Sequence, residues 1–268
     1  MAFLQDIALG RYIALDSPIH RLDPRTKLGG VFALTLAAFA APNALALLLL
    51  GAFLLVATAL ARVPSRLLLR QLKTFAWLFL FTFGLHALLT PGRAVLPLPF
   101  SDHALTAEGL RLGAFFTARL AAAIVAATLL TLTTAPMEIT SGLERFFSPL
   151  RRFGFPAGDM ALMVSIALRF IPVLLDEAER LRKAQLARGV DFSGSFLRRS
   201  KNLVPLLVPL LVAACGRADR LALAMESRCY ASGAERTHYR PLRFGRADGL
   251  CALAALGLVA LVYLCRSF

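Results

Sequence analysis

The sequence predicts an all-α integral membrane protein with about five transmembrane helices and a cytoplasmic domain of three helices, two of them long and crossing. The mean hydropathy is +0.68, and hydrophobic residues make up 58% of the 268 positions. Several apolar runs approach the roughly 20 residues that a helix needs to cross a bilayer. Between two of these runs lies a basic stretch of about 110 residues, 136–246. A membrane protein with one large charged insertion accounts for all three observations.

Proline-containing breaks divide the apolar sequence into five predicted membrane spans. Pro42 and Asn43 form a turn between the first two spans, which we expect to pack as a hairpin. Pro91 and Gly92 end the third span and begin a proline-rich loop. Arg119 lies inside the fourth span, and the sequence assigns it no role. The predicted spans are residues 28–41, 44–61, 74–90, 106–135 and 247–264.

The distribution of basic residues predicts the orientation of these spans. The chain carries 30 Lys and Arg against 16 Asp and Glu, a formal net charge of +14. Residues 1–27 hold 4 of the basic side chains, residues 62–73 hold 4 and residues 136–246 hold 18. By the positive-inside rule, all three segments face the cytoplasm. We therefore interpret the charge as a topology signal, and we expect no nucleic-acid partner and no removable signal peptide.

This orientation divides the chain into three predicted parts. Residues 1–135 contain an N-terminal segment and the first four membrane helices. Residues 136–246 form a cytoplasmic domain, and residues 247–268 form the last membrane helix. Five crossings place the two termini on opposite sides of the membrane, with the N-terminus in the cytoplasm.

Three helices are predicted within the cytoplasmic part, at residues 137–152, 157–188 and 199–230. The second and third each begin apolar and then become densely charged, as a helix does where it emerges into water. An alternative treats 160–175 and 203–215 as two extra spans, which gives seven crossings instead of five. Both segments are shorter than a normal span and contain prolines, so we favour helices that lie across the membrane face.

The titratable residues form no pattern typical of a catalytic or metal-binding site. Four cysteines are scattered without a Cys-x-x-Cys spacing, and four histidines are equally dispersed. The sequence has no Gly-x-x-x-x-Gly-Lys-Ser/Thr loop for nucleotide phosphates. Asp176, Glu177 and Glu179 are the nearest candidate for a catalytic cluster, but basic residues are interleaved with them as on a solvated helix. We therefore expect no metal, no cofactor and no chemical reaction in this chain.

Two arginines flanked by small side chains end the two charged helices. The first motif is Ala187-Arg188-Gly189 and the second is Ser227-Arg228-Cys229. The helix dipole favours a cation at a C-terminus, and Gly189 suits a left-handed cap, so capping alone explains part of the pattern. Small neighbours also allow a helix tip to enter a groove, where a guanidinium can pair with a carboxylate. Two such tips on similar helices indicate a partner with two equivalent sockets.

These motifs carry a resemblance that extends over essentially the whole chain. Residues 16–28, Asp-Ser-Pro-Ile-His-Arg-Leu-Asp-Pro-Arg-Thr-Lys-Leu, are similar to the entry segment of the transmembrane T components of energy-coupling factor transporters, a branch of the ATP-binding cassette importers. Ala187-Arg188-Gly189 matches the first Ala-Arg-Gly motif of that family. The second motif, within residues 224–230, keeps the Arg but has Ser and Cys, which are still small, in place of Ala and Gly.

The resemblance implies a non-catalytic subunit of an ATP-driven importer. Two long coupling helices would cross on the cytoplasmic side, and Arg188 and Arg228 would dock into grooves of two ATPase subunits, which bind the ATP and Mg²⁺. Closing of the ATPases would move these helices and, through them, a separate substrate-binding membrane protein, the S component. The family also implies a bacterial or archaeal cytoplasmic membrane and uptake of a vitamin or a transition-metal ion, with cobalt, nickel and biotin all open.

The apolar halves of the two long helices are the surface predicted to meet the S component. Their Met, Leu and Val side chains suit repacking against more than one partner. The alternative is that these faces pack only on the chain's own spans. The predicted contact residues are Met160, Met163, Val164, Ala167 and Leu168 on the first helix and Leu206, Leu207, Leu210 and Leu211 on the second.

The alternative function is that of a permease subunit of another ATP-binding cassette transporter, which itself conducts the substrate. Such a subunit needs polar positions along several spans. The first, second and fifth predicted spans consist almost entirely of Ala, Leu, Val, Gly and Phe. The composition therefore favours a chain without a conduit of its own.

Overall fold

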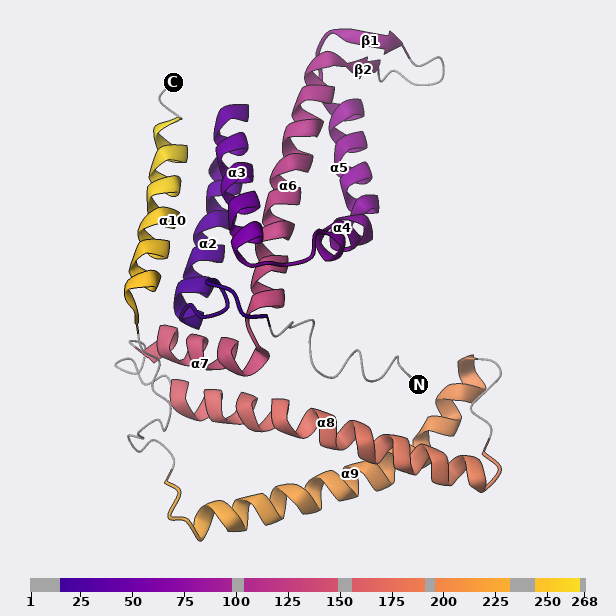
Figure 1. Ribbon diagram of the computed structural model, residues 1–268. Coiled ribbons are helices and arrows are strands. Elements are labelled where there is room, and N and C mark those ends of the chain that lie inside the picture. The colour runs from indigo at the N-terminus through magenta and orange to yellow at the C-terminus, as the bar shows by residue number, and fades with distance from the viewer. Residues whose placement is uncertain (1–14, 98–103, 149–155, 191–195, 232–243, 266–268) are drawn as a thin grey trace. The chain divides into compact units, whose positions relative to one another are not determined.

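The computed structural model describes residues 15–97, 104–148, 156–190, 196–231 and 244–265. The described residues divide into two compact units, 15–142 with 244–265, and 143–231. We call the first the helical bundle and the second the two-helix unit. Figure 1 labels the elements of both.

The helical bundle confirms the prediction of an all-α membrane domain. Helices at each of the five predicted spans begin and end within a few residues of the predicted limits, and the proline-rich loop contributes a short antiparallel hairpin. The elements are α2 (Pro24–Ala40), α3 (Ala44–Leu60), α4 (Ser65–Thr74), α5 (Ala76–Leu89), β1 (Ala94–Pro97), β2 (Ala104–Thr106), α6 (Ala107–Thr133) and α10 (Arg246–Leu264), with α7 (Pro136–Phe147) following α6.

Helix α4 is the largest local departure from the predicted layout. The basic residues before the third span form a separate helix, which is bent by 54° from α5. The break lies at Phe75, whose N–H donates to the carbonyls of Gln71 and Leu72 as α4 ends. The charges of residues 62–73 suggest only a connection between spans, whereas the helical spacing of leucines and cations gives this segment an apolar and a basic face.

The core of the bundle lies where α2, α3, α6 and α10 meet, and small residues dominate it. Short side chains allow the helix backbones to approach closely, which strengthens dispersion contacts that lipid tails cannot replace. Leu50 of α3 and Val262 of α10 fill the remaining space and are almost completely buried. The other buried members are Leu34, Ala37, Ala38, Ala41, Ala46, Leu54 and Ala126.

A buried polar cluster joins the ends of α2, α6 and α10. The ammonium of Lys27, 7% exposed, donates to the carbonyls of His20 at 2.9 Å and Thr133 at 3.0 Å. Asp248, 4% exposed, accepts from the backbone N–H of Asp23 at 2.7 Å and of Gly245 at 2.8 Å. Backbone groups that helix ends leave unpaired are thereby satisfied by two charged side chains of opposite sign.

The structure gives Arg119 the role that the sequence could not assign. Its guanidinium donates to the carbonyl of Ala41, in the turn between α2 and α3. The same group lies 4.4 Å from the ring centre of Phe115 and 5.1 Å from that of Phe116. Asn43 of the same turn donates to the carbonyl of Cys265 at 3.1 Å. Arg119 therefore holds the first hairpin to α6. Its charge is stabilised by a backbone acceptor and by two aromatic faces.

The outer surface of the bundle is apolar, as expected of a multi-pass membrane domain. Leu48, Leu55, Leu80, Leu250 and Leu253 are all largely exposed. By length and composition, α6 and α10 are each able to cross a membrane, α4 with α5 makes a bent pair of sufficient length, and α3 is a shorter apolar helix. Helix α8 of the two-helix unit also meets the criterion, so the placement of its apolar half across the membrane face stays a prediction.

Replacing Asp248 by Ala tests the polar cluster. The change leaves the buried N–H of Asp23 without an acceptor, so we expect the free energy of unfolding in detergent to fall by about 2 kcal/mol. Asp248→Asn, which keeps one acceptor oxygen, should lose less. The exposed carboxylate of Asp219 offers a matched control, and Asp219→Ala should change the value by no more than about 0.5 kcal/mol. Equal losses in Asp248→Ala and Asp219→Ala would contradict this account.

Candidate functional site

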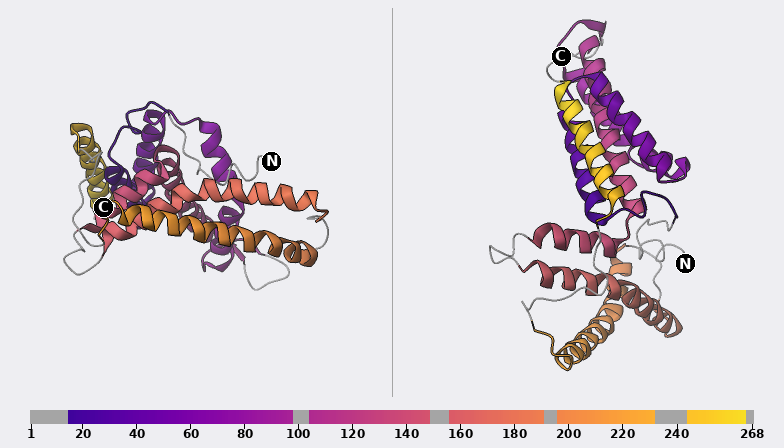
Figure 2. Two further views of the ribbon diagram at one scale, coloured as in Figure 1. Left: turned by 90° about the horizontal axis from the view of Figure 1, so that it is seen from below. Right: turned by 60° about the vertical axis from the view of Figure 1, so that its left-hand side comes forward.

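Two helices of equal length build the candidate site. Helices α8 (Ala157–Ala187) and α9 (Phe196–Glu226) each contain 31 residues, so the two long predicted helices are present. They run in opposite directions and cross at an angle, as Figure 2 shows from two sides. The C-terminal tips of the two helices therefore lie at opposite ends of the pair.

The first tip ends in a Schellman cap centred on Arg188. The N–H of Gly189 donates to the carbonyl of Leu186 at 3.0 Å, and the N–H of Val190 donates to that of Gln185 at 3.1 Å. Gly189 has a φ of 85°, the left-handed conformation that this motif requires after the capping residue. No atom lies within 4 Å of where a Cβ of Gly189 would stand, so the glycine serves the backbone and not close packing.

The second tip repeats the same cap with a residue other than glycine. The N–H of Cys229 donates to the carbonyl of Glu226 at 2.9 Å, and the N–H of Tyr230 donates to that of Met225 at 3.0 Å. Cys229 adopts a φ of 57°, although its side chain disfavours that region. The sequence predicts the cap at Gly189 but not the one at Cys229, because only a glycine signals a left-handed residue.

The two arginines consequently occupy the same position, the last residue before the left-handed one, on two equivalent helix ends. Arg188 and Arg228 are both exposed, as are the flanking residues Ala187, Gly189, Ser227 and Cys229. Within the described part of the chain, neither guanidinium takes part in an ion pair. Each offers a fork of donors to a carboxylate on another molecule, with the small neighbours leaving room for approach.

Two polar contacts join α8 to α9. Arg217 donates to a carboxylate oxygen of Glu177 at 2.8 Å, and the two side chains are 22% and 26% exposed, respectively. The hydroxyl of Tyr230, beside the second tip, donates to Asp159 in the first turn of α8 at 3.3 Å. The ion pair and the tyrosine contact hold the antiparallel helices at two separate places, so the two tips are parts of one joined structure.

The predicted partner-contacting residues lie on the apolar halves of the same helices. Met160, Met163, Val164 and Ala167 are exposed along one face of α8 at helical spacing, and Leu168 is half-buried. On α9, Leu207 and Leu211 are exposed, and Leu206 and Leu210 are half-buried. Contact of these faces with another membrane protein stays a prediction.

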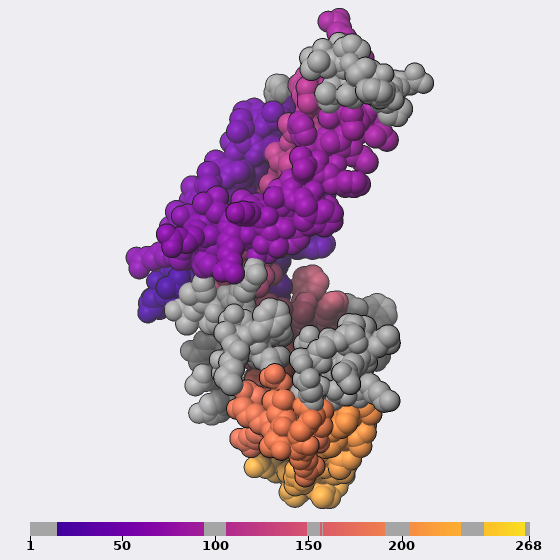
Figure 3. All heavy atoms as spheres, turned by 90° about the vertical axis from the view of Figure 1, so that its right-hand side faces the viewer, coloured from indigo at the N-terminus to yellow at the C-terminus, as the bar shows by residue number. Residues whose placement is uncertain are grey.

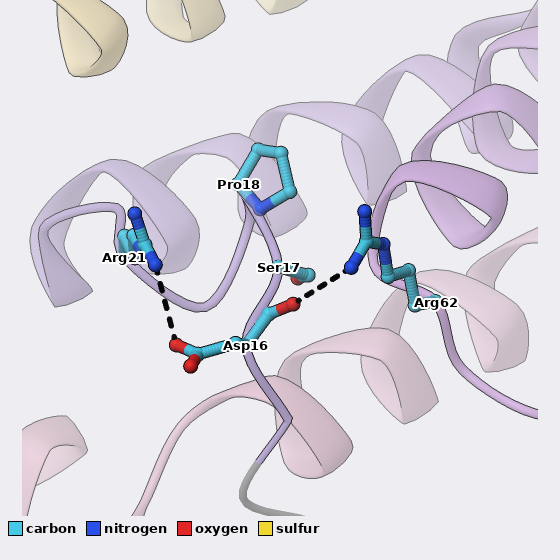
Figure 4. Close-up of a pocket in the computed structure, with 5 residues that line it drawn as sticks. All are labelled: Asp16, Ser17, Pro18, Arg21 and Arg62. Carbon is cyan, nitrogen blue, oxygen red and sulfur yellow. Dashed lines mark hydrogen bonds and ion pairs between the residues drawn. The ribbon is translucent and has the colours of Figure 1, made fainter.

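The entry segment that contributed to the resemblance belongs to the helical bundle. A pocket of about 370 Å³ is lined by Asp16, Ser17, Pro18, Arg21 and Arg62, and Figure 4 shows how these residues lie around it. The guanidinium of Arg21 lies 3.5 Å from the Asp16 carboxylate, and Arg62 donates to the Asp16 carbonyl at 3.5 Å. Because an exposed carboxylate offsets the two cations, the pocket alone makes a weak anion site.

Within the described residues, no group of three or more His, Cys, Asp or Glu side chains is arranged to hold a metal ion. Cys215, Cys229, Cys251 and Cys265 are free thiols. The described part of the chain therefore offers exposed cations and apolar faces, which are features of an interaction surface.

Comparison with known proteins gives one consistent result. The family model described as CbiQ, cobalt transport protein, matches residues 16–239. The chain is 47% identical to the energy-coupling factor transporter transmembrane protein EcfT of Heliobacterium modesticaldum, over 97% of this chain and 98% of that protein. It is 44% identical to the protein of the same name from Thermanaerovibrio acidaminovorans, over 97% and 98%, and 43% identical to that from Bacillus subtilis, over 98% and 100%.

Exchanging the third residue of each arginine motif tests the shared cap. Cys229→Gly removes the cost of a side chain in the left-handed region, so we expect the last turn of α9 to gain about 1 kcal/mol in stability against local opening. Gly189→Ala introduces that cost and should weaken the end of α8 by about the same amount. Amide hydrogen exchange at Tyr230 and Val190 measures both. Shifts of the same sign in the two variants would refute equivalent caps.

The ion pair between α8 and α9 can be tested by a double-mutant cycle. Because both side chains are only about one-quarter exposed, we expect Glu177→Gln and Arg217→Gln to be coupled by about 1 kcal/mol in the free energy of unfolding. The exposed pair Glu179 and Lys183, 3.1 Å apart within α8, is the comparison and should show a coupling of about 0.3–0.5 kcal/mol. No coupling between positions 177 and 217 would mean that the pair does not join the helices.

Proposed function

The chain belongs to the CbiQ cobalt transport protein family and is an energy-coupling transmembrane component of the EcfT type, and on that premise we propose that it transmits ATP-driven motion from two ATPase subunits to a separate substrate-binding membrane protein. The chain itself is a transport subunit. ATP and Mg²⁺ are held by the ATPases, and this chain needs no cofactor.

The observation that carries the proposal is the equivalence of the two helix tips. Arg188 and Arg228 both cap their helices, and in each case a left-handed residue turns the chain away immediately afterwards. A pair of ATPases offers two equivalent grooves, so one subunit with two equivalent tips satisfies both. A capping role alone leaves unexplained why both cations are exposed and unpaired within the described residues.

The two long helices are the levers that transmit the motion. A 31-residue helix is about 46 Å long, at 1.5 Å per residue. The contact of Glu177 with Arg217 ties the helices together away from the tips. A displacement applied at either tip is then passed along both helices, because helix backbones transmit strain with little compression.

The apolar halves of α8 and α9 receive the S component. Met160, Met163 and Val164 on α8, with Leu207 and Leu211 on α9, are largely exposed, and flexible Met and Leu side chains adapt to differently shaped partners. The transported vitamin or transition-metal ion is chosen by that partner. These apolar halves lie across the cytoplasmic face of a bacterial or archaeal membrane, with the N-terminus and the charged tips in the cytoplasm.

A substrate conduit within the bundle is disfavoured by where its polar groups lie. The buried charged side chains of the described residues, Asp23, Lys27 and Asp248, belong to one cluster at helix ends. Between the helix ends the packed core consists of Ala, Leu and Val. Translocation therefore depends on movement of the separate substrate-binding protein.

Charge reversal at the tips tests the proposal. The chain is co-expressed with candidate ATPase subunits and an S component, purified in detergent, and assayed for stoichiometric ATPases and for ATP turnover. We expect Arg188→Glu or Arg228→Glu to weaken docking by at least about tenfold and the double variant to abolish the complex, because each reversal places a carboxylate against a carboxylate. Arg188→Lys should retain partial docking, since it keeps the charge but loses the fork.

Matched controls place the same charge change elsewhere on the two helices. Arg182 and Arg220 are exposed on α8 and α9, away from the tips, and Arg182→Glu with Arg220→Glu should leave the complex intact. The S component should co-purify with every variant, which verifies the fold. Normal ATPase binding by the tip double variant would remove the mechanism and leave both arginines as helix caps.

A further inference from the structure

Helix α4 presents an exposed face of three cations that the transport mechanism does not use. Arg66, Arg70 and Lys73 recur at i, i+4 and i+7, which places them on one side of the helix. All three are exposed. The opposite side, which contains Leu67, Leu68, Gln71 and Leu72, is half-buried against the bundle. The cations therefore point away from the packed helices.

These cations lack acidic neighbours in the sequence and ion pairs in the structure. No Asp or Glu occurs anywhere in residues 24–101. Among the described residues, Arg66, Arg70 and Lys73 belong to no ion pair. Arg62, four residues before Arg66, adds a fourth cation whose recorded contact is the Asp16 carbonyl at 3.5 Å. An uncompensated cluster of this kind attracts an anion from outside the chain.

The position of α4 in the chain indicates that this cluster lies near the surface of the bilayer. The helix connects the apolar helices α3 and α5, both of the membrane domain, and is bent by 54° from α5. Trp77, the single tryptophan of the chain, lies in the first turn of α5, four residues after Lys73, and is 68% exposed. Tryptophan prefers the level of the lipid headgroups. Figure 3 shows the purple atoms of α4 and α5 on the open surface of the bundle.

We propose that the basic face of α4 binds the headgroup phosphate of an anionic phospholipid in the cytoplasmic leaflet. The arginines form paired hydrogen bonds to phosphate oxygens, and Lys73 adds a point charge. Leu69, 65% exposed beside the cations, and Leu80 and Phe81 on α5, both largely exposed, contact the acyl chains of the same lipid. Cations and apolar side chains that lie side by side suit a phospholipid better than a free phosphate.

This proposal differs from simple burial of the protein in a membrane, because it predicts a preference among lipids. An apolar surface alone does not distinguish phosphatidylglycerol from phosphatidylcholine. Basic residues near an anionic membrane surface contribute roughly fivefold each to the association constant. The proposal is also independent of ATPase docking, which uses residues of the other unit.

Trp77 provides the probe for the test. The chain is reconstituted into phosphatidylcholine vesicles that contain a minor fraction of a brominated lipid. The brominated lipid is either phosphatidylglycerol or phosphatidylcholine, and in both the bromine lies near the headgroup end of the acyl chains. Bromine quenches the fluorescence of a tryptophan that it contacts. For the wild type we expect brominated phosphatidylglycerol to quench Trp77 with at least about fivefold higher relative affinity. The preference should fall at high salt and should persist in the presence of soluble glycerol phosphate, which distinguishes a lipid from a free phosphate.

The decisive variant is Arg66→Gln with Arg70→Gln and Lys73→Gln, for which the preference should fall to about one. The control, Arg180→Gln with Arg182→Gln and Lys183→Gln, removes the same three charges from the charged end of α8 and should leave the preference unchanged. Arg66→Lys with Arg70→Lys should retain most of it, which keeps the test decisive if the glutamine variant does not fold. Equal quenching by the two lipids in the wild type, or an equal loss in the control, would overturn the proposal.

Discussion

The folded bundle depends on hydrogen-bond acceptors for the ammonium of Lys27, which is buried away from water. A buried ammonium costs several kcal/mol unless hydrogen-bond acceptors and counter-charges compensate it. Here it donates to the Thr133 carbonyl at the end of α6 and to the His20 carbonyl of the entry segment. The carboxylates of Glu138, Asp248 and Asp23 lie near enough to act on its charge. Because no single element supplies all these groups, the start of α2, the end of α6 and the start of α10 must come together.

The opposite end of the bundle obeys the same rule with different residues. A turn between two membrane helices exposes carbonyl oxygens that lipid cannot satisfy. Arg119 reaches the carbonyl of Ala41, and Asn43 reaches that of Cys265. Polar side chains therefore gather at the two ends of the bundle, and small apolar residues pack between them. This division shows how the bundle keeps an apolar core, because its interior cations Lys27 and Arg119 donate to backbone oxygens near the helix ends.

Local sequence patterns were sufficient for features that depend on composition or on helix ends. The five apolar helices and the two long helices appear close to their predicted limits, because hydropathy and proline breaks act over short distances. Helix α4 was missed because its cations dominated the interpretation of residues 62–73, although Leu67, Leu68 and Leu72 give it a packed side. The contacts of Arg119 with Ala41 and of Glu177 with Arg217 join residues 78 and 40 positions apart. A local sequence pattern cannot predict such contacts, because they depend on how the helices pack against one another.

The cap at Cys229 shows which physical feature the second arginine motif shares with the first. A left-handed residue with a side chain costs about 1 kcal/mol more than glycine, so the chain accepts that cost where a glycine would avoid it. The hydrogen bonds of the cap are nevertheless the same as those at Gly189, with distances that agree to about 0.1 Å. Backbone geometry at the tip is therefore maintained even though two of the three motif residues differ. The shared cap fixes the last turn of both helices, and it does so through the backbone, which makes the side chains at the first and third motif positions replaceable by other small residues.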